Sequence, residues 1–276
     1  MPELPEVECL TQSIKSVLEG QQITNSWFFR KDLRWEIPIS EFQQAFHSKK
    51  IGEVRRRSKY ILMTAGDKMA AIHLGMSGNV LLFDTKEPSL PHTHFVLEVN
   101  SAKGKQYLHY VDPRRFGFLV CFKKSEFNDH ALFKHLGPEP LEAKALGAYL
   151  WKTAQKKSAP IKSFLMDAKN VVGVGNIYAN EALFRAGISP LRASSKISKE
   201  SFTTLGTSIQ KTLKEAIRSG GTSFKDYKHL SGESGYFAIK LNVYGKEGDP
   251  CPQCKSPIQS KRLSNRATYY CMKCQS

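Results

Sequence analysis

The chain has 276 residues, which is long enough for two domains that each bury a core of their own. Lys and Arg number 41 against 25 Asp and Glu, so the formal net charge is +16 at pH 7. This excess favours a partner with a phosphate backbone, although a basic protein without a nucleic-acid role is the alternative. The apolar run at 116–122 is far shorter than the roughly 20 residues of a membrane-spanning helix. Because the acidic N-terminus also lacks a secretory signal, we expect a cytoplasmic protein without a membrane partner.

The first residues carry an unusual combination of groups, since Pro2 follows Met1 directly and Glu3 follows Pro2. Removal of Met1 would leave a secondary amine that is partly neutral near pH 7. Such an amine can attack a sugar C1′ to form an iminium, while Glu3 moves protons. The alternative is structural, because Pro5 and Glu6 suit the start of a helix and apolar residues follow at helical spacing.

After this segment, short β-branched and aromatic runs alternate with clusters of Gly, Pro, Asn and Asp, as is typical of strands and turns. We expect strands at 23–29, 54–63, 70–74, 80–83, 95–99, 107–111 and 116–122. Many short strands that are interrupted in this way predict a β-sandwich.

Beyond residue 122 the apolar residues recur at helical spacing. We expect helices at 125–136, 143–156, 160–169, 175–186 and 198–219, followed by a loop at 220–237 and a cysteine-rich hairpin. The chain is therefore predicted to be an α+β protein with three domains. They are a helix plus β-sandwich domain at 1–130, a helical domain at 131–240 and a hairpin domain at 241–276.

Four of the six cysteines form two CxxC pairs that are 16 residues apart: Cys251, Cys254, Cys271 and Cys274. This spacing predicts one tetrahedral zinc ion held at two turns of a β-hairpin. Four thiolates fill the coordination sphere, so the zinc would be structural. Cys9 and Cys121 lie in apolar segments and are expected in the core.

Further segments carry groups that suit a nucleic acid. The glycines of 171–180 precede an expected helix whose first N–H groups could bind phosphate, with Lys157 and Lys162 nearby, although tight helix packing would also explain them. The turns at 73–78 and 112–117 present a large apolar side chain among glycines. Exposed Met and Phe beside Arg are explained if they insert between stacked bases.

Several segments follow one another in a characteristic order: MPELPEVE, RRRSKY, HLGMSG, DPRRFG, HLGPEPL, VVGVGNIYANE and the two cysteine pairs. Over essentially its whole length the chain resembles the formamidopyrimidine-DNA glycosylase family of bacterial base-excision repair enzymes. The resemblance implies a monomer with a β-sandwich, a helix-two-turn-helix domain and a zinc finger. It implies an enzyme that flips oxidised purines out of double-stranded DNA, removes the base and cuts the strand by β,δ-elimination.

The resemblance also implies roles for individual residues. Pro2 would be the Schiff-base nucleophile, Glu3 the proton donor near the sugar and Lys59 an acid in β-elimination. Arg266 would bind phosphate and serve δ-elimination, and Glu6 would help to order the site. The residues that would contact DNA are His92, Arg114, Lys157, Lys162 and Asn176. The residues that would fill the gap left by the flipped nucleotide are Met76, Arg114 and Phe116.

Two alternatives remain at this stage. Relatives specific for oxidised pyrimidines share the fold, the terminal proline and the finger, although Leu4, the turn at 75–78 and the segment Thr222–Phe237 are similar to the purine-specific branch. A zinc-dependent DNA-binding protein without catalysis is the second alternative, and the presence of Pro2, Glu3 and Lys59 argues against it.

Overall fold

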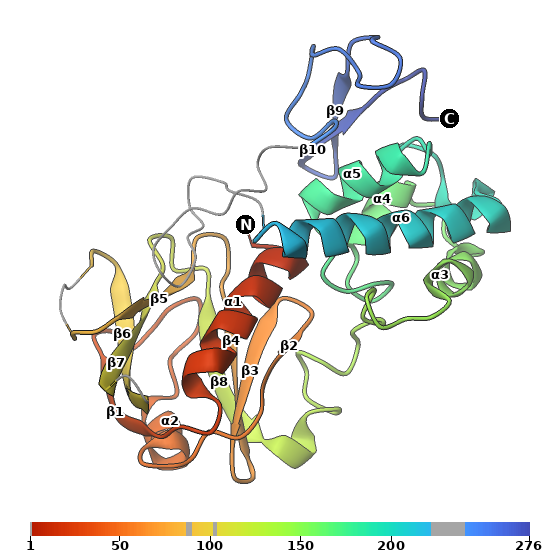
Figure 1. The fold of residues 1–276 in the computed structure, drawn as a ribbon. Coiled ribbons are helices and arrows are strands. Elements are labelled where there is room, and N and C mark those ends of the chain that lie inside the picture. Colours follow the sequence, from red (N-terminus) through yellow and green to blue (C-terminus); the bar gives the residue numbers. More distant parts are fainter. Residues whose placement is uncertain (1, 87–89, 102–103, 222–240) are drawn as a thin grey trace. The chain divides into compact units, whose positions relative to one another are not determined.

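The structure, a computed structural model, describes residues 2–86, 90–101, 104–221 and 241–276 (Figure 1). Within these residues the chain forms two compact units, one built mainly from 2–134 and the other from 135–218 and 241–276. The expected division into three domains stays a prediction. Thr222–Phe237, which entered the comparison of substrate branches, lies outside the described residues.

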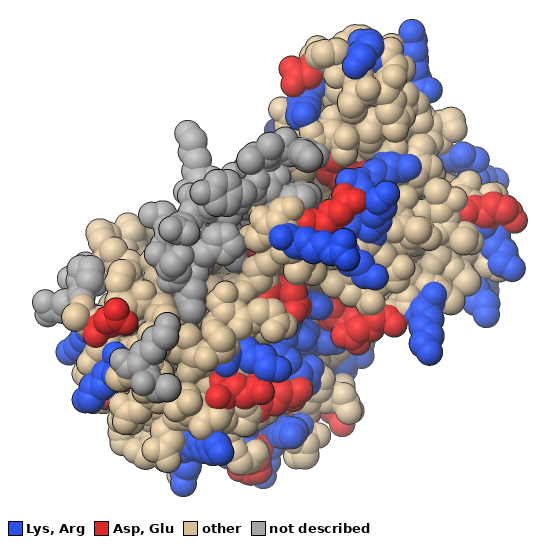
Figure 2. Space-filling view, viewed as in Figure 1, with Lys and Arg blue, Asp and Glu red and all other residues tan. Residues whose placement is uncertain are grey.

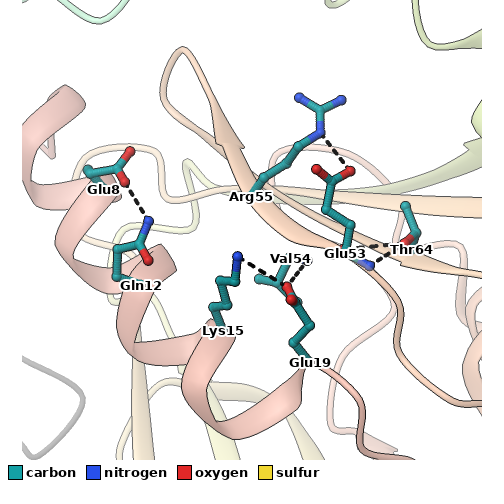
Figure 3. Close-up of polar contacts among 8 residues, drawn as sticks. All are labelled: Glu8, Gln12, Lys15, Glu19, Glu53, Val54, Arg55 and Thr64. Carbon is teal, nitrogen blue, oxygen red and sulfur yellow. Dashed lines mark hydrogen bonds and ion pairs between the residues drawn. The ribbon is translucent and has the colours of Figure 1, made fainter. Parts of the chain in front are cut away.

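The first unit begins with helix α1, Leu4–Leu18. Its buried stripe includes Val7, Leu10 and Ile14, which recur every three to four residues as an amphipathic helix requires. The helix ends before Gly20, whose φ of 84° is a conformation that few other residues adopt. Polar contacts hold α1 along the neighbouring strand β2 (Val54–Arg57), where Glu19 accepts the Val54 N–H at 2.9 Å (Figure 3).

Two four-stranded antiparallel sheets make up most of this unit (Figure 1). One sheet has the order β1 (Ile23–Phe28), β6 (Thr93–Ser101), β7 (Gly104–Val111) and β5 (Asn79–Phe83). The other has the order β2 (Val54–Arg57), β3 (Tyr60–Ala65), β4 (Lys68–His73) and β8 (Phe118–Lys123). Buried side chains from both sheets and from α1 form one hydrophobic core, which confirms the β-sandwich.

Three details of this unit differ from the expected elements. The single strand at 54–63 is two strands, because Ser58 and Lys59 form a tight turn in which Ser58 has a φ of 55°. A short helix, α2 (Ile39–Phe46), was not expected; its Phe42 and Phe46 rings stack 4.8 Å apart.

The third difference is at 125–136, where the expected helix is wrong. Only the 3₁₀ turn Lys124–Glu126 forms, followed by irregular turns. The His130 ring accepts the Leu132 N–H at 3.3 Å, and aromatic contacts between Phe127 and Phe133 replace helical packing.

The second unit contains helices α3 (Leu146–Ala154), α4 (Ile161–Met166), α5 (Asn176–Arg185) and α6 (Lys199–Arg218). They agree closely with the four helices expected beyond residue 140. Helices α3 and α6 approach each other at two glycines, since a Cβ on Gly206 would lie 2.5 Å from the Gly147 nitrogen. Any larger residue at either glycine would push the two helices apart.

Near its C-terminal end the chain forms a β-hairpin of β9 (Gln259–Leu263) and β10 (Arg266–Tyr270), joined by a turn at Ser264 and Asn265. The α+β class, with an N-terminal sandwich, a helical part and a four-cysteine hairpin, is thereby confirmed. Among the described residues no helix is long and apolar enough to cross a membrane.

Candidate active site and metal centre

The N-terminal end of α1 holds two buried carboxylates in fixed positions. Glu3 caps the helix: its side chain accepts the N–H of Glu6, and the Glu6 side chain accepts the N–H of Glu3 at 2.8 Å. This reciprocal pair satisfies backbone donors that have no partner within the helix. Both side chains are only 2% exposed, and Pro2, which precedes the cap, is also buried. The helix start therefore fixes the carboxylate next to Pro2.

Lys59 lies in the turn between β2 and β3. The alternation of Arg55, Arg57 and Lys59 had suggested a place on a strand face instead. The turn is tied to α1 through Arg56, which pairs with Glu8 at 2.6 Å and donates to the Ser58 carbonyl at 2.8 Å. The side chain of Arg56 is 5% exposed. A buried, hydrogen-bonded ion pair of this kind positions Lys59 relative to α1.

His73 stands opposite Tyr60 in the ladder of β3 and β4 and stacks on Phe118 with ring centroids 5.1 Å apart. Burial, together with the positive charges of Lys59 and Arg34, lowers the pKa of His73 to about 4. Its Nδ1 accepts the Gly75 N–H at 3.0 Å. The imidazole is thus neutral at physiological pH, with its proton on Nε2.

The two glycine-containing turns of this unit present the expected large side chains at the surface. Met76 is 37% exposed and Phe116 is 42% exposed. The Arg114 guanidinium lies 4.9 Å from the centre of the Phe116 ring, and His92 is exposed as well. The sequence predicted an apolar wedge at these turns, and the exposure of the side chains fits that prediction.

In the second unit, the four cysteines of the two CxxC pairs come together with all sulfur atoms within 4.8 Å of one another. Sγ of Cys251 lies 3.8 Å from Cys274, and Sγ of Cys254 lies 3.4 Å from Cys271. Four sulfurs about 2.3 Å from one zinc ion at tetrahedral angles would lie roughly 3.8 Å apart, so this donor set fits structural zinc.

The remaining two cysteines take no part in this centre. Burial raises the pKa of the Cys9 and Cys121 thiols to about 12. Such thiols stay protonated at neutral pH and are poor ligands and poor nucleophiles. Both residues are half-buried, and Cys121 packs against the hydrophobic core.

Lys162 departs from the phosphate contact that was expected of it. Its side chain is 1% exposed, and Nζ donates to the Ala267 carbonyl at 2.8 Å and to Thr268 Oγ1 at 2.7 Å. An ammonium ion enclosed in this way cannot reach a phosphate without leaving its acceptors. It instead holds strand β10, whose first residue is Arg266, against helix α4.

The other cationic and polar residues expected to contact DNA in this unit are accessible or lie at a helix start. Lys157 and Arg266 are exposed. Asn176 is the first residue of α5, and its Nδ2 donates to the Tyr244 hydroxyl at 3.5 Å. On the face drawn in Figure 2, Lys and Arg side chains are interspersed with Asp and Glu, so the net charge alone does not locate a binding surface.

Some positioning residues were missed at the level of sequence. Arg56 was treated only as part of a basic run, although strand alternation places it on the face opposite Arg55 and Arg57. Glu181, 2% exposed, was not noticed; its carboxylate accepts the backbone N–H groups of Asn242, Val243 and Tyr244 at 2.9 to 3.0 Å. The available signal was a carboxylate among the mostly apolar residues 177–184 of α5.

Three family models match the chain in order. They are the formamidopyrimidine-DNA glycosylase N-terminal domain at residues 1–119, the H2TH domain of the same enzymes at 136–228, and the zinc finger found in FPG and IleRS at 248–276. Relatives named formamidopyrimidine-DNA glycosylase from Marinobacter nauticus and Vibrio parahaemolyticus are each 42% identical, and the match covers 100% of both chains.

Solved structures agree with these matches. A MutM structure in complex with DNA that contains carbocyclic 8-oxo-G has a TM-score of 0.89 and 30% identity over 100% of both chains. A Lactococcus lactis FPG mutant bound to Fapy-dG DNA has a TM-score of 0.90 and 29% identity over 100% of both chains. The MutM protein of Thermus thermophilus has a TM-score of 0.86 and 33% identity, covering 99% of this chain and 98% of that one.

Replacing a zinc ligand tests the metal centre. Cys271→Ser should lose zinc and unfold the hairpin, because metal binding and local folding are coupled. Zinc content measured by atomic absorption should fall from about one ion per chain to near zero. Cys121→Ser is the matched control and should keep its zinc. Full zinc content in Cys271→Ser would contradict the assignment.

Replacing Lys162 tests its support of β10. Lys162→Met keeps the length of the side chain but leaves the Ala267 carbonyl and the Thr268 hydroxyl without their donor. Hydrogen exchange of β10 amides should accelerate by about 10-fold or more, since a lost hydrogen bond to a charged group costs about 1.5–3 kcal/mol. Lys157→Met, at an exposed lysine, should leave this exchange unchanged. Equal exchange rates of the β10 amides in both variants would rule out the role of Lys162 in holding β10.

Proposed function

This chain belongs to the formamidopyrimidine-DNA glycosylase family, and we propose that it removes oxidised purines from duplex DNA and then cuts the strand with Pro2 as its nucleophile. The observation that carries this proposal is the buried pair of Glu3 and Glu6 at the helix start, directly after a residue that becomes a secondary amine when Met1 is removed. Relatives bound to Fapy-dG and 8-oxo-G DNA support oxidised purines as the substrate class.

The first chemical step breaks the glycosidic bond. The Pro2 nitrogen attacks C1′ of the damaged nucleotide, the bond from C1′ to the base breaks, and the base leaves with the bonding electrons. Glu3 serves as the proton donor near the sugar, and opening of the ring gives an iminium. The capping contact keeps the Glu3 carboxylate in one position, so little ordering of this group is needed during the reaction.

Two eliminations then cut the strand. The iminium withdraws electrons, so a proton leaves C2′ and the bond from C3′ to its phosphate oxygen breaks. Lys59 acts as the acid in this β-elimination, from a turn that Arg56 holds against α1. Arg266 binds phosphate and assists the δ-elimination, in which a proton leaves C4′ and the bond from C5′ to its phosphate oxygen breaks.

Binding to DNA draws on both units. Lys157, Arg266 and the α5 start at Asn176 contact phosphates, and His92 adds a contact from the first unit. Lys162 contributes indirectly by holding β10. Met76, Arg114 and Phe116 fill the space of the flipped nucleotide. The enzyme acts in the cytoplasm and associates with the nucleoid through this binding.

Borohydride trapping tests the nucleophile and the substrate branch together. With an 8-oxoguanine duplex, the reduced adduct should lie on the peptide that begins with Pro2, because borohydride reduces the iminium to a stable C–N bond at whichever amine has attacked C1′. A duplex with an oxidised pyrimidine should trap much less. An adduct on Lys59 would overturn the nucleophile, and preferential trapping of the pyrimidine would favour the other branch.

Arg114 is expected to make the enzyme prefer cytosine opposite the lesion. Arginine offers donors only, and the orphaned cytosine presents two adjacent acceptors, O2 and N3. The corresponding edge of adenine has only one acceptor, N1, and the amino group beside it is a donor that would oppose the guanidinium. A bidentate contact discriminates by about 1 to 3 kcal/mol, which is roughly 5- to 150-fold. Excision rates for Arg114→Ala on lesion:C and lesion:A duplexes should show a selective loss on lesion:C. A uniform loss on both would indicate a phosphate contact.

A further inference from the structure

Three separate segments of the first unit meet at the place from which Met76, Arg114 and Phe116 project. They are the turns at 73–78 and 112–117 and the segment 92–94, which leads into β6. Each turn alone is short and glycine-rich, and would sample many conformations in isolation. Something must fix them relative to one another if their exposed side chains are to act together.

The Asp112 carboxylate lies at the centre of these segments and is completely buried. One oxygen accepts the Ser77 hydroxyl at 2.6 Å and the Arg114 N–H at 3.3 Å. The other oxygen accepts the Gly117 N–H at 2.8 Å. A single side chain thus bonds to the turn that carries Met76 and to both ends of the segment that carries Arg114 and Phe116.

The backbone of Asp112 extends the same network to the third segment. Its N–H donates to the His92 carbonyl at 3.1 Å, and its carbonyl lies 2.8 Å from Nε2 of His94. The same carbonyl accepts the Arg115 N–H at 3.2 Å, which closes a turn in which Arg115 has a φ of 56°. His92 is therefore held by the residue that also organises the wedge.

Close backbone packing leaves the two turns no room to slide. A Cβ on Gly117 would lie 2.6 Å from the His73 carbonyl oxygen, and a Cβ on Gly78 would lie 2.8 Å from the Tyr110 hydroxyl. Ser77 adds a second bridge, because its Oγ accepts the Arg114 N–H at 3.1 Å while it donates to Asp112. The turns therefore hold each other in register, and Asp112 is the group they share.

The hydrogen-bond donors around this position favour a carboxylate. A buried carboxylate must be hydrogen-bonded to offset its lost hydration, and here two N–H groups and one hydroxyl point at its two oxygens. An amide in its place would present an NH₂ group to one of these donors. Asparagine has almost the same shape but would lose at least one of the three hydrogen bonds that the Asp112 oxygens accept, because its NH₂ group cannot accept.

We propose that Asp112 is a positioning residue that sets Met76, Arg114 and Phe116 in their final arrangement before DNA binds. The wedge then enters the duplex as one rigid body, and the Arg114 guanidinium faces the orphaned base without first being ordered. The proposal rests on the proposed function, since it concerns how that enzyme opens a duplex and inspects the opposite base.

The test compares Asp112→Asn with Asp129→Asn, which makes the same charge change at an exposed position of the same unit. Single-turnover excision is measured on lesion:C and lesion:A duplexes, and strand cleavage is measured on a single-stranded oligonucleotide with a preformed abasic site, which needs no wedge. Asp112→Asn should lose about 10-fold or more on lesion:C, as expected for a lost hydrogen bond to a charged group. The ratio of its excision rates on lesion:C and lesion:A should fall toward one. Its rate of cleavage of the single-stranded substrate should stay within about twofold of wild type. Asp129→Asn should match wild type throughout.

Several results would overturn the proposal. Wild-type discrimination in Asp112→Asn, or equal losses on duplex and single strand, would each do so. If Asp112→Asn fails to fold by circular dichroism, Ser77→Ala removes one donor and keeps the carboxylate; it should show the same selective loss at smaller size, and wild-type behaviour would reject the proposal. Failure of the proposed function is separate, because the wild-type protein would then form no borohydride adduct on any substrate.

Discussion

The Glu8–Arg56 ion pair joins the helix that carries Glu3 to the hairpin turn that carries Lys59, across 48 residues of sequence. Both side chains are largely withdrawn from water, with exposures of 19% and 5%. Burying two charges costs hydration, so this pair need not stabilise the fold more than apolar residues would. Its value lies in geometry, because removing either partner would leave the other charge buried and the turn unanchored. The reactions proposed for Pro2, Glu3 and Lys59 all depend on a fixed position of the Lys59 turn relative to the start of α1.

The hairpin of the second unit is held by a different kind of constraint. The zinc site closes the ends of the hairpin, and Lys162 and Asn180 fix β10 to helices α4 and α5. Asn180 Oδ1 accepts the Tyr269 N–H at 2.8 Å, close to the two acceptors of Lys162. Zinc bound at the four cysteines would couple metal binding to folding of the hairpin, and the buried side chains decide where Arg266 is presented. Losing zinc and losing Lys162 should therefore affect Arg266 in different ways.

Three buried carboxylates share one pattern: Glu3 in the capping pair, Glu181, which accepts the N–H groups of residues 242–244, and Asp112. In each case a buried carboxylate accepts backbone N–H groups that no helix or sheet partner satisfies. Such N–H groups occur where the chain turns sharply, and the segments held by Glu3 and Asp112 are those that carry residues of the proposed reaction and wedge. Buried carboxylates therefore order these segments of the protein through hydrogen bonds to their backbone, while the surface carries the net positive charge that suits DNA.

The amino-acid sequence by itself determined the features that depend on neighbouring residues. The zinc ligands follow from two local CxxC turns, the β-sandwich from short alternating runs, and the proposed chemistry of Pro2 and Glu3 from their order in the chain. Their signals lie within a few residues and need no knowledge of distant partners. The capping pair of Glu3 and Glu6 was also within reach of the sequence, because it is a local motif.

Only the tertiary structure decided the positions that depend on distant acceptors. Lys162 was expected to contact phosphate from its place near the glycine-rich segment 171–180 and from the family resemblance, yet its acceptor Thr268 lies 106 residues further along the chain. The same holds for Asp112, whose partner Ser77 is 35 residues away, and for the irregular turns at 125–136, where aromatic packing replaced a helix. A residue pattern records which groups can bond; only the folded chain determines which of them meet.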